Sequence, residues 1–178
     1  MDFRGPYRQR PGLEPITGQR WRISTPSNVL PAPRRSQSPN SILLVADHDE
    51  EALVLKRTLR SAGIKMPIRI AQDVPAAKAY LQGDPPFSDR ARYPLPSVLI
   101  LHLHVPRKSG FDVVRWLRAQ PQFRHIFVVV FVSPRKVSEI TLAYRLGANW
   151  FLTDPCRAED IRNLVQNFPD HWAASPAR

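Results

Sequence analysis

Two histidines, His102 and His104, stand where an apolar run gives way to a loop, in the stretch ILHLHVPRKSG at positions 100–110. The apolar part is typical of a buried strand, and the Pro, Lys, Ser and Gly that follow are typical of a turn. An imidazole at such a junction can bind a metal, accept a phosphoryl group or pair with a carboxylate. Two carboxylates, Asp47 and Asp154, also follow apolar runs. Their chemistry depends on whether the fold brings them close to the histidines.

The order of the elements brings these groups together. From position 41 onwards, apolar runs alternate with helical patterns. We expect strands over 41–46, 66–71, 97–104, 126–132 and 149–153, and helices over 52–63, 73–81, 111–119, 136–146 and 157–168. The predicted fold class is therefore α/β, a five-stranded parallel doubly wound sheet in the order 2-1-3-4-5 with helices on both faces. Asp47, His102 and Asp154 are then expected at the carboxyl ends of strands 1, 3 and 5, on one edge.

The composition divides the chain of 178 residues into three parts. Residues 1–40 hold seven prolines, and seven arginines against two acidic residues give them a net charge of +5 out of the total of +11. Few aliphatic residues occur there, so we predict a disordered, basic, Pro/Arg-rich arm. Residues 41–170 are predicted to form the folded domain, and residues 171–178 a C-terminal tail.

The charge and the cysteine content limit the class of protein. No apolar run is long enough to span a membrane, and the single cysteine, Cys156, fits a reducing compartment, so we expect a cytoplasmic protein. A basic arm can bind nucleic acid, but no stacking platform or recognition-helix pattern accompanies the charge, and solubility is the favoured interpretation. Trp21, within the arm, is a candidate binding hot spot.

Several motifs carry a resemblance to a known family. They are ILLVADHDE, PLPSVLILHLHVPRKSGFDVVRWLRA, AYRLGANWFLTDP and AEDI. With these motifs the chain resembles the receiver domains of two-component response regulators over nearly all of 42–168. It looks most similar to the small single-domain receivers that work beside phytochrome-like sensor kinases.

The resemblance also shows where the chain departs from the family. A receiver uses an aspartate after strand 3 as phosphoacceptor, an acid pair after strand 1 for Mg²⁺, a hydroxyl after strand 4 and a lysine after strand 5. The matching positions here are His102, the pair Ala46 and Asp47, Val132, and Asp154. Only Asp47 keeps the family's residue type. The resemblance therefore implies a degenerate phosphorylation site, with Mg²⁺ binding weak or absent and no other cofactor.

Two exchanges at this site face one another. His102 replaces an acid and Asp154 replaces a base, so we expect a charge-swapped pair in which Asp47 and Asp154 favour the imidazolium form of His102. Asp154-Pro155 stands where the family has Lys-Pro, a peptide bond that is typically cis there, so Pro155 is a cis-proline candidate. Phe151 occupies the family's aromatic switch position and is expected to pack in one fixed position.

The residue types also suggest three other chemistries: zinc binding, phosphorylation of a histidine and a reactive thiol. His102 and His104 have the spacing of a zinc-chelating pair, with Asp47 or Asp154 as a third ligand, but a structural role is favoured and no metal site is predicted. Phosphorylation of His102 lacks a group that would activate the ring. Cys156 precedes a helix and could be reactive, although a passive, half-buried thiol is the favoured interpretation.

The sequence predicts a degenerate, phosphorylation-independent receiver that acts as a protein-interaction module in bacterial signal transduction, and not an enzyme. The expected partner is a protein, either a sensor histidine kinase or an effector. A homodimer through 136–146, 149–153 and 157–168 is also expected, and membrane or nucleic-acid binding is not. The alternatives are a phosphorelay receiver with an unconventional acceptor and a nucleic-acid binder that uses the arm.

Overall fold

The computed structural model describes residues 13–16, 20–23, 40–102, 110–132 and 137–172. The chain divides into two compact units, residues 1–31 and 32–178. In the first, β1 (Leu13–Ile16) and β2 (Arg20–Ile23) form an antiparallel pair. These two short strands lie within the segment 1–40, for which we predicted disorder. The rest of that segment, apart from Asn40, lies outside the described residues.

The second unit is built on a five-stranded parallel sheet. Its strands are β3 (Ile42–Val45), β4 (Ile68–Ala71), β5 (Val98–His102), β6 (Phe127–Val132) and β7 (Trp150–Thr153). Their order in the sheet is β4-β3-β5-β6-β7, which is the predicted order 2-1-3-4-5. The α/β fold class predicted from the sequence is therefore confirmed.

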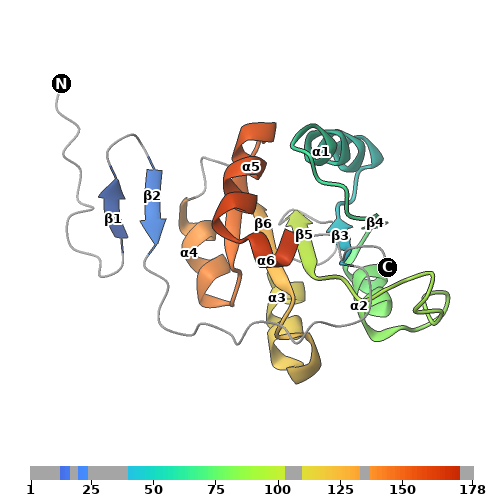
Figure 1. The fold of residues 1–178 in the computed structure, drawn as a ribbon. Coiled ribbons are helices and arrows are strands. Elements are labelled where there is room, and N and C mark those ends of the chain that lie inside the picture. The colour runs from blue at the N-terminus through green and yellow to red at the C-terminus, as the bar shows by residue number, and fades with distance from the viewer. Residues whose placement is uncertain (1–12, 17–19, 24–39, 103–109, 133–136, 173–178) are drawn as a thin grey trace. The chain divides into compact units, whose positions relative to one another are not determined.

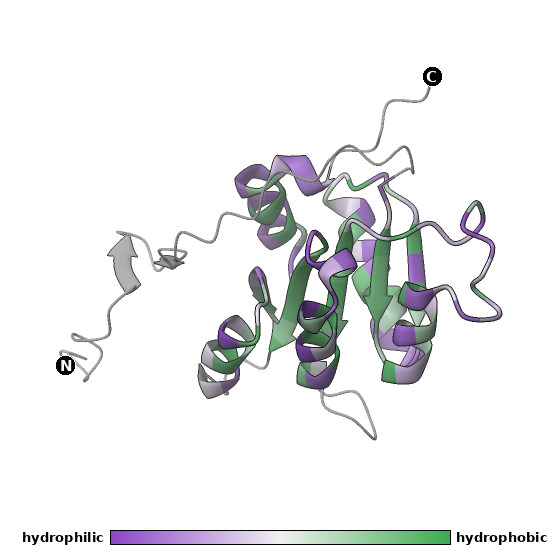
Figure 2. Cartoon of the chain, turned by 90° about the horizontal axis from the view of Figure 1, so that it is seen from below, coloured by the Kyte–Doolittle hydropathy of each residue, from purple (hydrophilic) through white to green (hydrophobic). Residues whose placement is uncertain are grey.

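Helices cover both faces of this sheet (Figure 1). They are α1 (Asp49–Ser61), α2 (Val74–Gln82), α3 (Gly110–Ala119), α4 (Val137–Arg145), α5 (Ala158–Asn167) and α6 (Pro169–Trp172), with a short 3₁₀ helix, η2 (Pro121–Phe123). Leu43 and Val45 of β3 pack with α2, α3 and α4, whereas Ile42 and Leu44 pack with α1, α5 and α6. Successive strand residues point to opposite faces, so each apolar strand contributes to two cores. Figure 2 shows apolar strands between helices whose polar residues face outward.

Local signals in the sequence set the ends of α2. The Asp73 carboxylate accepts a hydrogen bond from the Ala76 N–H at 2.7 Å, as a helix N-cap does. Gly83 closes the helix in the left-handed region, with φ of 80°. This capping fixes the helix beside β3 and β4, which form one side of the sheet.

The C-terminal boundary of the domain lies further along the chain than we predicted. We expected a tail from position 171, but α6 reaches Trp172, whose side chain is 5% exposed and packs in the core beneath α1 and α5. Burial of a large indole explains why this turn stays on the domain. The Ser97 hydroxyl also donates to the His171 carbonyl oxygen at 3.2 Å. Residues 173–178 lie outside the described residues.

None of the helices in the described part of the chain has the length and apolar character needed to cross a membrane.

Candidate functional site

The carboxyl ends of the parallel strands bring the predicted site residues to one edge, which we call the carboxyl edge. In the strand registers, Val45 pairs with Leu101, and His102 pairs with Phe131. At β7, the Asp154 N–H donates to the Val132 carbonyl oxygen at 3.4 Å. Ala46 and Asp47 directly follow β3. The prediction that these chain segments converge is therefore confirmed by the sheet topology.

The His102 side chain does not form the ion pair that we predicted for it. Its Nε2 lies 4.0 Å from Glu51 Oε2, and neither Asp47 nor Asp154 is within that distance. The ring stacks on Phe131, with centroids 6.0 Å apart and planes 10° apart. His102 Nδ1 is buried and has no hydrogen-bond partner among the described residues. The expected charge-swapped pair with Asp154 is thus wrong in this structure.

Glu51 was missed because its role depends on where α1 begins. We expected the helix from position 52, so Glu51 lay before it and was not among the predicted site residues. The structure begins α1 at Asp49, so Glu51 lies in the first turn, next to the carboxyl edge. The signal was present: a helix that follows a parallel strand places its first turn at the site edge.

The remaining carboxylates at the carboxyl edge have no shared partner. Asp47 is 9% exposed, and its Oδ2 lies 3.3 Å from Nε2 of His48, a side chain that is mostly in solvent. Asp154 is exposed. Among the described residues, no three His, Cys, Asp or Glu side chains form a group that could hold a metal ion. The predicted role of His104 stays open, because residues 103–109 lie outside the described part of the chain.

Apolar side chains occupy two of the predicted positions. Val132 is buried in the core beneath α2, α3 and α4. Phe151 packs against the same core, with its ring edge-on to Tyr144 at 6.1 Å. The Asp154–Pro155 peptide bond is cis, as expected for the cis-proline candidate.

Cys156 lies just before α5 and has a protected thiol. Burial, together with Asp160 and Asp154, raises the pKa of this thiol to about 12. The Sγ atom is 3.6 Å from the Arg157 carbonyl oxygen, and the side chain packs against the apolar core. A thiol with a raised pKa is a poor nucleophile, which agrees with a passive role.

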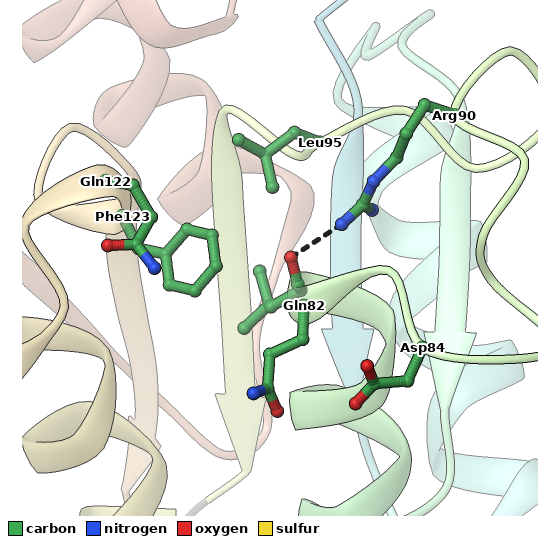
Figure 3. Close-up of a pocket in the computed structure, with 7 residues that line it drawn as sticks. Gln82, Asp84, Arg90, Leu95, Gln122 and Phe123 are labelled. Atoms are coloured by element: carbon green, nitrogen blue, oxygen red, sulfur yellow. Dashed lines mark hydrogen bonds between the residues drawn. The ribbon is translucent and has the colours of Figure 1, made fainter.

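A pocket of about 520 Å³ lies at the opposite end of the sheet, between the end of α2, the loop that follows it and η2. Arg90 is one of the residues that line this pocket (Figure 3), and it donates to the Tyr80 and Leu81 carbonyl oxygens, each at 2.7 Å. These bonds hold the 83–96 loop against α2. We therefore treat this pocket as a structural feature rather than as the functional site.

The sheet order, the convergence of strand ends and the position of α1 lead to the comparison with known proteins. Residues 42–166 match the model of the response regulator receiver domain. The chain belongs to this family. Receiver domains are signalling modules of two-component systems rather than classical enzymes. The matched residues include the carboxyl edge of the sheet.

Two response regulators illustrate the similarity of this chain to known receivers. It is 28% identical to the response regulator Rcp1 of Synechocystis sp. over 137 residues, which cover 77% of this chain and 91% of Rcp1. It is 31% identical to RPA3017, a response regulator in red light signalling of R. palustris, with a TM-score of 0.67 over 77% of this chain and 99% of that one.

Two solved structures show relatives with a bound metal ion or in phosphorylated form. The Mn²⁺-bound form of Rcp1 is 26% identical, with a TM-score of 0.62 and coverage of 78% of this chain and all (100%) of that chain. The phosphorylated cyanobacterial phytochrome response regulator RcpA is 22% identical, with a TM-score of 0.62 over 78% of this chain and 99% of that one, and shares the fold.

Proposed function

We propose that this receiver is degenerate: it signals by binding a protein partner without accepting a phosphoryl group at its carboxyl edge. The observation that carries the proposal is the histidine at the end of β5. His102 supplies an imidazole and no carboxylate at the phosphoacceptor position. Its ring stacks on Phe131, its Nδ1 is buried, and its Nε2 lies 4.0 Å from Glu51 Oε2.

The surrounding residues support the same proposal on physical grounds. Mg²⁺ prefers several hard oxygen ligands, but Ala46 is a buried methyl group and Asp47 is the one carboxylate of the acid pair. A transferring phosphoryl group needs nearby positive charge. Asp154 places a negative charge at the position where the family resemblance implies a lysine. Val132 contributes a buried isopropyl group instead of a hydroxyl.

A phosphodonor experiment tests this proposal. The full chain is incubated with Mg²⁺ and acetyl phosphate, and intact mass is measured beside RcpA as the positive control. We expect no phosphoryl adduct on the wild-type chain or on His102→Asp, because Ala46, Val132 and Asp154 are unchanged. A variant that also carries Ala46→Asp, Val132→Thr and Asp154→Lys should gain a hydroxylamine-sensitive adduct.

The position of any adduct decides between the alternatives. An Mg²⁺-dependent, hydroxylamine-sensitive adduct on the wild-type chain would show that a carboxylate is phosphorylated, and the proposal would be wrong. An adduct mapped to His102 that survives alkali, which cleaves an acyl phosphate, would instead support the phosphorelay receiver with an unconventional acceptor. Failure of the fourfold variant to accept a phosphoryl group, with its fold intact, would mean that these four positions do not explain inactivity.

The same proposal includes an output surface made by α4, β7 and α5. Leu142 on α4 is exposed, and Tyr144 of α4 forms an aromatic group with Trp150 and Phe151 of β7. Exposed apolar and aromatic side chains are typical of protein contact surfaces. Sedimentation velocity of the full chain should show a dimer that Leu142→Glu weakens. Val54→Glu on α1 adds the same charge at an exposed apolar position and should leave the dimer unchanged.

A further inference from the structure

The edge strand β4 directs part of its backbone to solvent. It pairs with β3 and with no other strand in the described part of the chain. The Ile42 N–H donates to the Pro67 carbonyl oxygen at 2.8 Å, and the Ala46 N–H donates to the Ala71 carbonyl oxygen at 3.1 Å. The carbonyl groups of Pro67 and Ala71 therefore point toward β3. Backbone groups alternate in direction along a strand, so every second residue from Pro67 to Ala71 faces β3 and the residues between them face away. Ile68 and Ile70 therefore direct their N–H and C=O groups away from β3.

Helix α1 lies along this edge and is bonded near both ends of β4. The Gln72 side chain donates to Asp49 Oδ1 at 3.1 Å, and Arg60 Nη1 donates to the Met66 carbonyl oxygen at 3.0 Å. Leu53 is four residues after Asp49 and therefore shares its side of the helix. Leu53 thus lies on the side of α1 that the Asp49 bond turns toward β4.

One face of β4 is apolar and exposed. Ile68 packs with the core beneath α1, and Ile70, two residues on, points to the same face. Ile70 is 38% exposed and Leu53 is 47% exposed. Two exposed apolar side chains beside unpaired backbone groups are what a docked strand would cover.

The other face of β4 is basic. The Cζ atoms of Arg69 and Arg92 lie 5.6 Å and 5.3 Å from the centroid of the Tyr93 ring, and Arg69 Nη2 donates to the Arg92 carbonyl oxygen at 2.9 Å. Both arginines are exposed, and in the described part of the chain neither is within ion-pair distance of a carboxylate. This face therefore offers two cations to an incoming chain.

We propose that β4 binds an extended acidic segment of a partner protein, which adds a strand to the sheet. Side chains of that segment would alternate between apolar residues, over Leu53 and Ile70, and acidic residues, beside Arg69 and Arg92. Backbone bonds to Ile68 and Ile70 would align the segment.

Charge selects this occupant over two others. A second copy of the chain would bring Arg69 and Arg92 close to the same cations, which is unfavourable. The chain's own residues 1–40 carry a net charge of +5, with the same consequence. The surface is formed by β4, α1 and Tyr93, so binding here can succeed or fail independently of phosphoryl transfer at the carboxyl edge.

Binding is measured with the full chain and a labelled peptide of alternating valine and glutamate, by fluorescence anisotropy. A four-residue edge offers few backbone bonds, so we expect a Kd of about 10–100 μM. Replacing glutamate by lysine in the peptide should abolish binding. Methylating alternate peptide nitrogens on the bonding side should weaken binding about tenfold or more, because ladder bonds are lost. In NMR spectra, the amide signals of Ile68 and Ile70 should shift on titration.

Variants of the chain locate the site. Arg69→Glu should weaken peptide binding about tenfold or more, whereas Arg115→Glu, the same charge change at an exposed position on α3, should alter it less than about twofold. Ile70→Lys should also abolish binding, with thermal melting confirming that the fold is kept. Equal binding of the methylated peptide, no binding near 1 mM (about 4 kcal/mol), or self-association that Ile70→Lys removes would each overturn the proposal.

Discussion

The two ends of the parallel sheet satisfy their polar groups in different ways. At the amino edge, where the strands begin, Arg118 donates to the carbonyl oxygens of Gly147, Arg124 and Ile126 and to Asn149 Oδ1, over distances of 2.7–3.2 Å. At the carboxyl edge, the side-chain ion pairs among the described residues are those of Asp47 with His48, which is 70% exposed, and of His102 with Glu51, which is 47% exposed.

This difference means that the amino edge contributes more to the stability of the fold than the carboxyl edge, where the candidate functional site lies. The Arg118 bonds tie α3 to the segments that lead into β6 and β7, and removing such a partner leaves several acceptors without a donor. Exposed pairs at the carboxyl edge contribute little to stability, because water screens them. Residues at the carboxyl edge can therefore change type at small cost to the fold, as the degeneracy that we propose for His102 and Asp154 requires.

The largest expected effect follows from removing the Arg118 guanidinium. Burial lowers the pKa of Arg118 to about 10, so the group remains charged at pH 7. Arg118→Met keeps the apolar stem and should reduce the free energy of unfolding by about 2–4 kcal/mol. The measurement is urea denaturation followed by circular dichroism.

A matched control lies on the same helix. Arg115 is exposed and pairs with Asp112 at 3.1 Å. Arg115→Met should cost less than about 0.5 kcal/mol. Equal losses for the two variants would contradict the difference between the amino edge and an ordinary surface.

The second effect concerns a glycine that contacts Arg118. Gly147 has φ of 101°, and a Cβ atom there would lie 2.8 Å from Arg118 Cγ. Gly147→Ala should cost about 1–3 kcal/mol, from backbone strain and from displacement of the arginine stem. Gly63→Ala is the control, because Gly63 has φ of 93° and open space around it. A larger loss for Gly147, partly removed when Arg118→Met is also present, would confirm the contact.

The fold was predictable because the apolar runs and caps are local signals. The strand order followed from the alternation of elements, and Asp73 and Gly83 marked the ends of α2. The Arg118 bonds were not predictable, since they join segments far apart in the sequence, and a single arginine gives no sign of its acceptors. The end of the folded domain was misplaced for a related reason: the burial of Trp172 depends on a core formed by other elements.

The candidate site was predictable in position but not in pairing. Parallel topology placed Asp47, His102 and Asp154 at one edge. The partner of His102 depended on a shift in the start of α1, which brought Glu51 to the edge. A change of a few residues in a helix boundary is within the uncertainty of sequence patterns, yet it determines which carboxylate reaches the ring.

A smaller effect is expected from pH at the amino edge. Burial lowers the pKa of His171, which packs on Phe127 with ring centroids 4.7 Å apart; Asp170 opposes this shift, and His125 adds to it. The unfolded chain then takes up a proton near pH 6.5, before the folded chain does. Stability present above pH 6.5 is therefore lost as pH falls toward the folded-state pKa. The urea midpoint should fall more between pH 7.5 and 5.5 (about the histidine range) for wild type than for His171→Gln.

The smallest effect should come from the carboxyl edge itself. Glu51 is 47% exposed and its Oε2 is 4.0 Å from His102, which is 25% exposed, so Glu51→Gln should cost less than about 0.5 kcal/mol at pH 7. Glu50→Gln is the matched control, because both residues lie in the first turn of α1 and both favour its amino end electrostatically. The difference between the two losses isolates the His102 pair. If Glu51→Gln costs more than 1 kcal/mol beyond Glu50→Gln, about a fivefold change in the unfolding equilibrium, the carboxyl edge is held by this pair. The contrast between the two edges would then fail, because His102 would stabilise the fold in addition to the role that we propose for it at the phosphoacceptor position.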